Sequence, residues 1–233
     1  MRLLITGANR GLGFVRQYLE RGDEVIATCR RPNEAKELHK LANQYKNMLS
    51  IQELDVSSRD SINSTFVEIN QLFSSLDLLI NNAGIISGGC NRYHAFGKLH
   101  TEDLCKVFQI NTFGPVLTME KFVPLLKKGK NPKIVNISSR MGSLSLKRGT
   151  STYSYDASKA ALNMFSKAIA YKLKTEKISV LILYSGWAKT DMGTSRAPLK
   201  LEISVKGMIK VIDSSDLSDT GKFYDWDGNE VPW

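Results

Sequence analysis

Thr6-Gly7-Ala8-Asn9-Arg10-Gly11-Leu12-Gly13 joins an apolar run at residues 3–5 to a stretch with helical periodicity at about 11–21. Three glycines in such a loop let the backbone turn tightly and approach a pyrophosphate, whose charge meets the free N–H groups at the start of the helix. Their spacing, Gly-x-x-x-Gly-x-Gly, differs from the Gly-x-Gly-x-x-Gly of the long-chain dinucleotide fold. We therefore expect a strand–loop–helix unit that binds a dinucleotide through Gly7, Asn9, Arg10, Gly11, Leu12 and Gly13.

The rest of the chain alternates between short β-rich apolar runs and longer helical stretches. We expect strands at 3–5, 24–28, 49–54, 77–80, 133–137, 179–184 and 222–225, and helices near 11–21, 33–47, 58–74, 101–127, 155–175 and 202–214. This alternation is typical of βαβ units in a parallel sheet with helices on both faces. Right-handed crossovers make a doubly wound, Rossmann-type α/β sheet of about seven strands the simplest topology, with the ligand at the carboxyl ends of the strands.

The size and composition are those of one soluble domain. The chain has 233 residues, of which 42% are hydrophobic and 24% charged, without internal repeats or linkers. No apolar run approaches the roughly 18 residues that span a bilayer, and the apolar start is too short for a signal peptide. We expect a single cytoplasmic domain over residues 1–233, with loops at 85–99 and 193–199 at the carboxyl edge of the sheet.

The charge and the cysteines argue against nucleic acid and metal as ligands. Lys and Arg number 32 against 23 acidic residues, for a formal net charge of +9. The basic residues are dispersed, and the densest patch, at 127–133, coincides with an expected helix end, whose dipole it complements. Cys29, Cys90 and Cys105 are widely spaced and form no Cys-x-x-Cys pair, which disfavours a disulfide framework or a zinc site. We expect no nucleic-acid partner, no membrane partner and no metal.

The end of the second expected strand indicates which dinucleotide the loop would bind. An NAD site carries an Asp or Glu there, about 20 residues beyond the glycine loop, to bond the ribose. This chain instead reads Val25-Ile26-Ala27-Thr28-Cys29-Arg30-Arg31. The guanidinium of Arg30 suits a 2′-phosphate, and Arg10 in the glycine loop can approach the same group. Solvation of a strand end is the alternative reading of Arg30 and Arg31. The residues favour NADP(H) over NAD(H).

Tyr155 and Lys159 form the candidate catalytic pair. They stand four residues apart at the start of a helical stretch, which puts both on one face. A free tyrosine has a pKa of about 10, and a nearby ammonium favours the phenolate; a shift of three units requires about 4 kcal/mol. Upstream, the expected strand at 133–137 runs into Ser138-Ser139, which places a hydroxyl at the sheet edge. Tyr-x-x-x-Lys alone is also typical of a surface helix. The strand that ends in two serines favours the catalytic interpretation of the pair.

Together these motifs resemble the short-chain dehydrogenase/reductase family, and within it the carbonyl-reductase branch of the sniffer and C-factor proteins. The matching residues follow the family's order: Thr6-Gly7-x-x-x-Gly11-x-Gly13, Asp55, Asn81-Asn82-Ala83-Gly84, Asn111, Ser139, Tyr155-x-x-x-Lys159, Gly186-Trp187-x-x-Thr190-Asp191-Met192 and Gly228-Asn229-Glu230-Val231-Pro232-Trp233. The resemblance implies a Rossmann-type fold with NADP(H) as cofactor.

The resemblance also implies a role for each matching residue. Tyr155 would be the general acid that protonates the carbonyl oxygen as hydride arrives from the nicotinamide, and Lys159 would bond the nicotinamide ribose and lower the tyrosine pKa. Ser139 would polarise the substrate carbonyl, and Asn111 would anchor a proton-relay water. The other cofactor contacts would be Asn82, Ala83 and Gly84 at the adenosine ribose, Asp55 and Val56 at the adenine, and Gly186, Ala188 and Thr190 at the carboxamide.

Two features depart from the family pattern. Ser185 stands where the family usually has proline; the loss of proline frees φ there, and its effect on the nicotinamide loop does not follow from the sequence. The segment between Ser139 and Tyr155, which carries Lys147 and Arg148, is slightly longer than in many relatives. Because this segment borders the substrate cleft, the size of the substrate does not follow from the resemblance.

We therefore expect an NADPH-dependent oxidoreductase that transfers hydride to the carbonyl of a small aldehyde, ketone or dicarbonyl. Two alternatives remain: an NADP(H)-binding signalling or regulatory factor of C-factor type with little turnover, and an alcohol dehydrogenase working in the oxidative direction. The resemblance also implies a homodimer through the helices near 101–127 and 155–175. Small residues there would allow close approach: Ala160, Ala161, Ala168 and Ala170.

Overall fold

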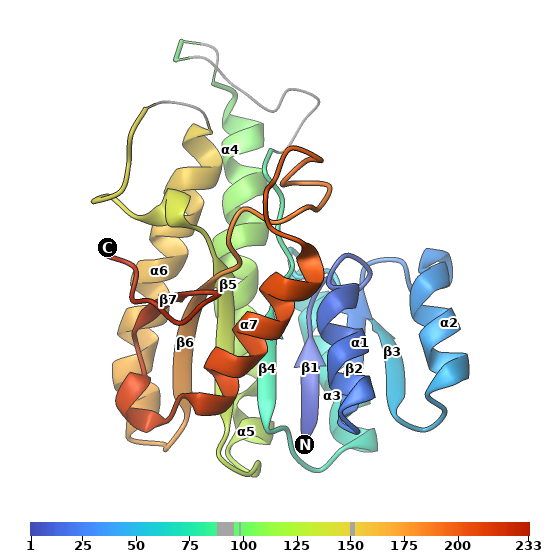
Figure 1. Cartoon of the computed structure of the whole chain (residues 1–233). Coiled ribbons are helices and arrows are strands. Elements are labelled where there is room, and N and C mark those ends of the chain that lie inside the picture. Colours follow the sequence, from blue (N-terminus) through green and yellow to red (C-terminus); the bar gives the residue numbers. More distant parts are fainter. Residues whose placement is uncertain (88–95, 98, 150–151) are drawn as a thin grey trace.

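All the expected β-rich runs form strands, and these pair in one parallel sheet (Figure 1). The computed structural model describes residues 1–87, 96–97, 99–149 and 152–233. The strands are β1 Arg2–Ile5, β2 Glu24–Cys29, β3 Leu49–Glu53, β4 Leu78–Asn81, β5 Lys133–Ser138, β6 Ser179–Tyr184 and β7 Phe223–Asp225. Their order across the seven-stranded sheet is β3-β2-β1-β4-β5-β6-β7, which confirms the predicted doubly wound Rossmann-type fold.

The strand order reverses between β1 and β4, and this reversal positions the site. The chain runs outward from β1 through β2 to β3, and then returns to the other side of β1 to build β4 through β7. The loops that follow β1 and β4 therefore lie beside each other at the carboxyl edge and continue in opposite directions. Open α/β sheets bind their ligands at such a point.

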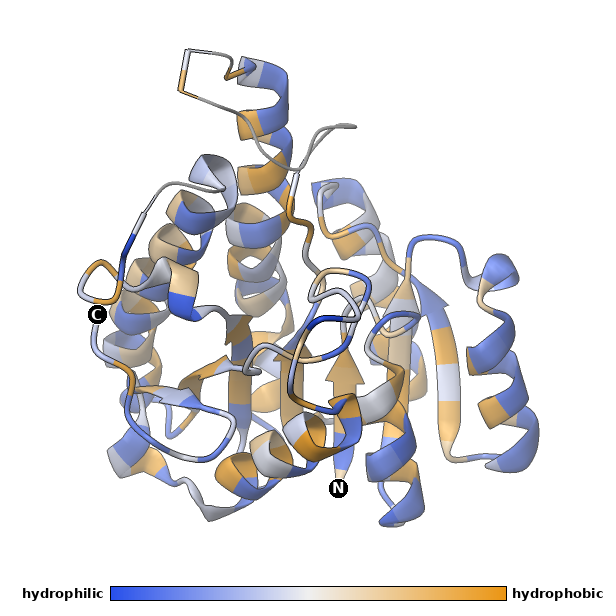
Figure 2. Cartoon of the chain, turned by 45° about the horizontal axis from the view of Figure 1, so that its top comes forward, coloured by the Kyte–Doolittle hydropathy of each residue, from blue (hydrophilic) through white to orange (hydrophobic). Residues whose placement is uncertain are grey.

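Helices cover both faces of the sheet. One face carries α1 Leu12–Glu20, α2 Lys36–Gln44 and α7 Leu201–Ser214; the other carries α3 Arg59–Leu72, α5 Gly114–Leu126 and α6 Tyr153–Lys174. Successive strand residues point to alternate faces, so that Leu3 and Ile5 pack with the first set of helices and Leu4 with the second. Figure 2 shows the strands as the apolar centre, with hydrophilic residues on the outer helix surfaces. Within the described ranges, no helix combines the length and apolar character needed to cross a membrane.

The stretch predicted as one helix at 101–127 is interrupted. It consists of α4 Thr101–Phe108, a π-helical turn at Gln109–Phe113, and α5. Pro115 explains the interruption, because it has no N–H to donate to the carbonyl of Asn111, its partner in a regular α-helix. The chain adopts a wider spacing, in which the N–H of Gly114 donates to the carbonyl of Gln109. The prediction of a continuous helix was therefore wrong at the turn that carries Asn111.

The other boundaries lie within a few residues of those predicted. α6 begins at Tyr153 rather than at 155, and a 3-10 turn at Pro32–Glu34 precedes α2. The predicted loop at 193–199 contains neither helix nor strand. Most of the predicted loop at 85–99, with Cys90, lies outside the described residues.

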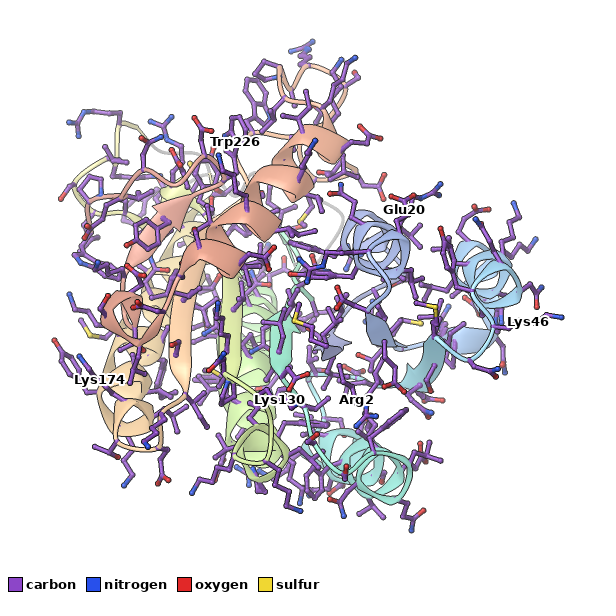
Figure 3. All side chains as sticks on the ribbon, turned by 60° about the horizontal axis from the view of Figure 1, so that its bottom comes forward. Arg2, Glu20, Lys46, Lys130, Lys174 and Trp226 are labelled. Carbon is purple, nitrogen blue, oxygen red and sulfur yellow. The ribbon has the colours of Figure 1, made fainter. Side chains whose placement is uncertain are left out.

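The densest basic patch lies at the opposite end of the sheet from the glycine loop. α5 ends at Leu126 and β5 begins at Lys133, so the patch at 127–133 borders the amino ends of the strands. Figure 3 looks at this end of the molecule, where Lys130 is labelled. The Nζ of Lys133 donates to the carbonyls of Ile212 and Ser215 at the end of α7 (2.5 and 2.7 Å). The patch is thus remote from a ligand at the carboxyl edge.

Candidate active site

The glycine loop lies directly on the segment that leaves β4. Gly7 has a φ of +62°, and a Cβ there would lie 2.8 Å from the Cα of Ala83. A Cβ on Gly11 would lie 2.6 Å from Nδ2 of Asn82. The same Nδ2 donates to the carbonyls of Thr6 and Gly7 (3.0 and 3.1 Å). These two glycines therefore permit the close packing of two loops, and Asn82 fixes the backbone that a pyrophosphate would meet.

Gly13 serves the packing of helices, whereas the start of α1 is suited to bind a phosphate. A Cβ on Gly13 would lie 2.9 Å from Cγ2 of Val205, so this glycine lets α1 pack against α7. At the N-terminus of α1, Gly11 is the cap residue and supplies no side-chain acceptor, and no acidic residue occupies the first turn. Leu12 begins the helix and packs on the core. The partial positive charge of this helix end is left for a ligand, which suits a phosphate.

The two arginines expected at a 2′-phosphate are held at different places. Arg30 is exposed immediately after β2, where the sequence predicts it. Arg10 is exposed beside Asn9 in the glycine loop, and its Nη2 donates to the carbonyl of Gly84 (3.0 Å). Arg10 thus contacts the segment that follows β4, and its approach to the same 2′-phosphate as Arg30 stays a prediction.

Asp55 and Val56 follow β3 at the expected adenine end. One carboxylate oxygen of Asp55 accepts from the N–H and the hydroxyl of Ser57 (2.9 and 2.6 Å). Val56 is buried, and its carbonyl oxygen would lie 2.8 Å from a Cβ on Gly114. Neighbouring groups therefore fix both residues, and Val56 connects this end of the site to the start of α5.

Tyr155 and Lys159 lie on the first turns of α6, as their spacing predicts. Lys159 is buried, and its Nζ lies 5.8 Å from the centre of the Tyr155 ring. The ammonium donates to the carbonyl of Ile137 near the end of β5 (2.8 Å). Burial lowers the pKa of Lys159 to about 8. At neutral pH the group is therefore mainly an ammonium, enclosed beside the phenol.

The pKa of Tyr155 is set mainly by burial. Burial raises this pKa to about 12; the hydrogen bond with Ser139 lowers it, and the charges of Asp156 and Tyr184 raise it. Desolvation outweighs the favourable hydrogen bond, and the lowering of this pKa by Lys159 stays a prediction. The phenol is therefore protonated at neutral pH, which is the state that a proton donor needs.

Ser139 connects the end of β5 to Tyr155. Its Oγ accepts from the N–H of Met141 (3.1 Å), which caps the following 3-10 turn, and its hydroxyl lies close enough to the phenol to lower the pKa of Tyr155. A Cβ on Gly142, in the same turn, would lie 2.7 Å from the carbonyl carbon of Lys159, so the turn packs directly on α6. The structure thus brings the serine hydroxyl, the phenol and the ammonium together at the carboxyl edge.

Asn111 is fully buried and holds the segment that follows β4. Its Nδ2 donates to the carbonyl of Ile85 (2.8 Å) and to the hydroxyl of Ser158 (3.1 Å), and its Oδ1 accepts from the N–H of Ile85 (2.8 Å). A Cβ on Gly84 would lie 3.3 Å from this Oδ1 and 3.7 Å from Nζ of Lys159, so the three residues cluster. Both amide hydrogens of Asn111 are used within the protein, so the expected relay water would have to bond to one of its oxygens.

The loop that follows β6 is firmly held although it lacks the family proline. Gly186 has a φ of +71°, and a Cβ there would lie 2.7 Å from both Leu199 and Trp226, which is labelled in Figure 3. The carbonyl of Ser185 accepts from the buried Ser204 hydroxyl (2.5 Å). Side-chain packing around Gly186 and the hydrogen bond from Ser204 therefore hold the loop at the point where the family has proline.

The same loop carries the remaining predicted cofactor residues. Ala188 is buried, and Thr190 accepts from the N–H of Gly193 through its hydroxyl (2.9 Å). Trp187 is half exposed, and its Nε1 donates to the carbonyl of Gly193 (2.7 Å). The structure places this loop after β6 at the carboxyl edge, as predicted.

The sequence reasoning missed side chains of α6 that hold the site. Asn163 lies one turn beyond Lys159; it accepts from the Ser138 hydroxyl (2.5 Å) and donates to the carbonyl of Gly142 (3.3 Å). Asp156, beside Tyr155, is also buried. Polar residues recur at helical spacing along this face, where apolar residues are the rule, and that pattern was the available signal. The described residues contain no cluster of three side chains suited to a metal ion.

Comparison with known proteins agrees with this geometry. The family model of the short chain dehydrogenases matches residues 2–200. C-signal of Myxococcus xanthus is 38% identical over 158 residues, which are 68% of this chain and 93% of that protein. An NADPH-bound carbonyl reductase from chicken fatty liver has a TM-score of 0.92 and 35% identity, covering 100% of this chain and 98% of its own. The carbonyl reductase Sniffer of D. melanogaster has a TM-score of 0.93 and 31% identity, covering 100% and 99%.

Proposed function

Because the chain belongs to the short-chain dehydrogenase family, we propose that it is an NADPH-dependent carbonyl reductase in which Tyr155 supplies the proton. One observation carries the proposal: the Lys159 ammonium is buried 5.8 Å from the centre of the Tyr155 ring, and the Ser139 hydroxyl lies close enough to the phenol to lower its pKa. The similarity to two carbonyl reductases supports the class of reaction.

The residues at the carboxyl edge fit NADPH, which when bound would supply the hydride. The N-terminus of α1, without an acidic or capping side chain, would receive the pyrophosphate, and Arg30 would receive the 2′-phosphate. The 82–84 segment would line the adenosine ribose, Asp55 and Val56 the adenine, and the 186–190 loop the carboxamide. Lys159 would bond the nicotinamide ribose.

In the proposed reduction, the chain's own residues move the proton and hold the negative charge. The Ser139 hydroxyl would hold the substrate carbonyl beside the phenol of Tyr155, whose pKa it lowers. As hydride reaches the carbonyl carbon, the phenol would release its proton to the carbonyl oxygen. The resulting phenolate would be stabilised by the ammonium of Lys159, which desolvation leaves with few competing partners.

The proposal is tested by following NADPH oxidation with a panel of aldehydes, ketones and dicarbonyls. We expect consumption of NADPH with at least one class, with the corresponding alcohol as product. Binding of NADPH without consumption would favour the second candidate, a signalling or regulatory factor, to which the similarity with C-signal points. Faster oxidation of alcohols with NADP⁺ would favour a dehydrogenase working in the oxidative direction.

We expect the enzyme to prefer NADPH over NADH, and Arg30→Asp to abolish that preference. A hydrogen bond to a charged group contributes about 1.5–3 kcal/mol, so kcat/KM for NADPH should fall about 10- to 100-fold, while that for NADH falls little. Arg31→Asp is the matched control, because Arg31 is also exposed but pairs with Glu34 (3.3 Å), and it should leave the cofactor preference unchanged. Equal efficiency with NADH in the wild type, or an unchanged preference in Arg30→Asp, would contradict the assignment.

We also propose that the outer faces of α5 and α6 form a homodimer. Met164 and Tyr171 are 70% and 72% exposed on α6, and Phe113, just before α5, is 42% exposed. Ala170 is 2% exposed and packs inside the chain, so it cannot contribute as the sequence suggested. Light scattering should give twice the 26.0 kDa of one chain, and Met164→Glu should halve that mass. A 26.0 kDa particle at every concentration would contradict the dimer.

The cytoplasmic location also stays a prediction.

A further inference from the structure

The segment of residues 139–147 leaves β5 and is bound to α6 at both of its ends. Near its start, a Cβ on Gly142 would lie 2.7 Å from the carbonyl carbon of Lys159, so the segment packs directly on α6, and the Ser139 hydroxyl lies close enough to the Tyr155 phenol to lower its pKa. At its end, the Nζ of Lys147 forms an ion pair with Asp156, the next residue of α6. The two ends of the 139–147 segment thus contact the same first turns of α6, which carry Tyr155, Asp156 and Lys159.

Asp156 is the buried member of the ion pair. Its side chain is 11% exposed, against 33% for Lys147. The second carboxylate oxygen accepts from the hydroxyl of Thr152, the cap residue of α6 (2.6 Å). Both oxygens are therefore partnered, and the only cation paired with this carboxylate among the described residues is Lys147. A buried carboxylate that loses its cation is strongly unfavourable, because its charge is then uncompensated.

The outer side of the 139–147 segment is anchored independently of Lys147. The hydroxyl of Ser143 donates to the carbonyl of Pro232 (2.5 Å), and the N–H of Ser145 donates to the carbonyl of Trp233 (2.8 Å). Leu146 packs with the cluster that contains Val231. These contacts hold the segment to the C-terminal residues of the chain, whereas Lys147 ties its end to the helix that carries Tyr155.

We propose that Lys147 is a positioning residue of the reductase, a role that rests on the proposed function: its ammonium neutralises Asp156 and fixes Ser139 relative to Tyr155. The positive charge of Lys147 has a second effect that also favours the reduction. The carboxylate of Asp156 raises the pKa of Tyr155. A cation held on that carboxylate offsets this effect and favours release of the phenol proton.

Lys147→Met should lower kcat about 10²-fold, the scale expected when a reacting group is misplaced by about 1 Å. The KM for NADPH should change little, because Lys147 contacts none of the residues proposed to bind the cofactor. Lys147→Arg keeps the positive charge, so its kcat should fall much less than that of Lys147→Met. The double variant Lys147→Met/Asp156→Asn leaves no uncompensated charge and should recover most of the lost kcat, which is the non-additivity expected of a coupled pair.

The experiment combines steady-state kinetics with hydrogen exchange on the full chain. Exchange of the amides at 143–147 should be faster in Lys147→Met than in the wild type, and should return towards the wild-type rate in Lys147→Arg. Lys40→Met is the matched control: Lys40 forms an ion pair with Glu37, but both side chains are exposed (72% and 55%), and such pairs contribute little. It should leave kinetics and exchange unchanged.

The outcomes separate this proposal from the proposed function. If the single variant Lys147→Met keeps wild-type kcat and exchange, or if the double variant is worse than the single one, Lys147 is not a positioning residue. A fall in melting temperature with no selective loss of kcat would show a merely structural ion pair and would also overturn the proposal. If the wild type reduces no carbonyl, the proposed function fails, and hydrogen exchange alone still decides whether Lys147 holds the segment.

Discussion

Tyr155→Phe is expected to lower carbonyl reduction by about 10²–10⁴-fold, the range of general acid catalysis, while the affinity for NADPH stays nearly unchanged. Phenylalanine keeps the volume and packing of the ring but removes the hydroxyl beside Ser139. The phenol is the proposed donor, and its raised pKa keeps it protonated at neutral pH. The loss should therefore appear in kcat.

The measurement is turnover, NADPH affinity and melting temperature on the same sample of Tyr155→Phe. Tyr45→Phe is the matched control, because Tyr45 follows α2 and packs on the core away from the site, and it should behave as the wild type. A tyrosine with only a structural role would lose activity in proportion to stability. Turnover within about tenfold of the wild type, well short of the general-acid range, would show that Tyr155 is not the acid.

Lys159→Met is expected to abolish most activity without destabilising the protein. Removing one preorganised group that stabilises developing negative charge typically costs about 10²–10³-fold in kcat, and NADPH should bind more weakly because the proposed ribose contact is lost. The folded chain, however, keeps the ammonium buried at a pKa of about 8. The lysine pKa in an unfolded chain is about 10.4, so burial costs roughly 3 kcal/mol at neutral pH.

The pH dependence follows from the sign of this shift. Between pH 8 and about 10.4 the unfolded state binds more protons at Lys159, so this group makes the wild type more stable as the pH rises through that window. Lys159→Met should lack this contribution. At pH 7 methionine removes the burial cost but leaves the Ile137 carbonyl without its donor, a loss of about 1–3 kcal/mol. The variant should therefore be at least as stable as the wild type.

Denaturant unfolding of both proteins from pH 7 to 10 tests this expectation, with Lys206→Met, an exposed lysine of α7, as the control. A Lys159→Met protein that is several kcal/mol less stable at pH 7, or whose stability rises with pH as in the wild type, would show that Lys159 is not a strained, functional cation.

The fold could be predicted because its signals are local. Apolar β-rich runs such as Val25–Cys29 and Ser179–Tyr184 identify strands that are buried on both faces, and alternation with helices determines the parallel sheet. The π-helical turn could not be predicted from periodicity, since apolar residues continue through it. Its cause, Pro115, is visible in the sequence, but the effect depends on the packing of Asn111 against Ile85.

The catalytic residues could be predicted where they share one element or one strand end, as Tyr155 and Lys159 do. The partners that hold them could not, because they meet only through tertiary structure. Arg10 bonds Gly84, Ser204 bonds Ser185, and Lys147 pairs with Asp156. The pKa of Tyr155 likewise depends on burial, which a four-residue spacing does not report.

The central claim is that this chain transfers hydride from NADPH to a carbonyl carbon while Tyr155 donates the proton. It is tested most directly with NADPH deuterated at the transferable position of the nicotinamide, with mass spectrometry of the product. The wild type should yield an alcohol carrying one deuterium on the former carbonyl carbon for each cofactor oxidised, and Tyr155→Phe should yield almost none although it binds the cofactor. Binding of NADPH by the wild type without deuterium in the product of any aldehyde, ketone or dicarbonyl would contradict the claim.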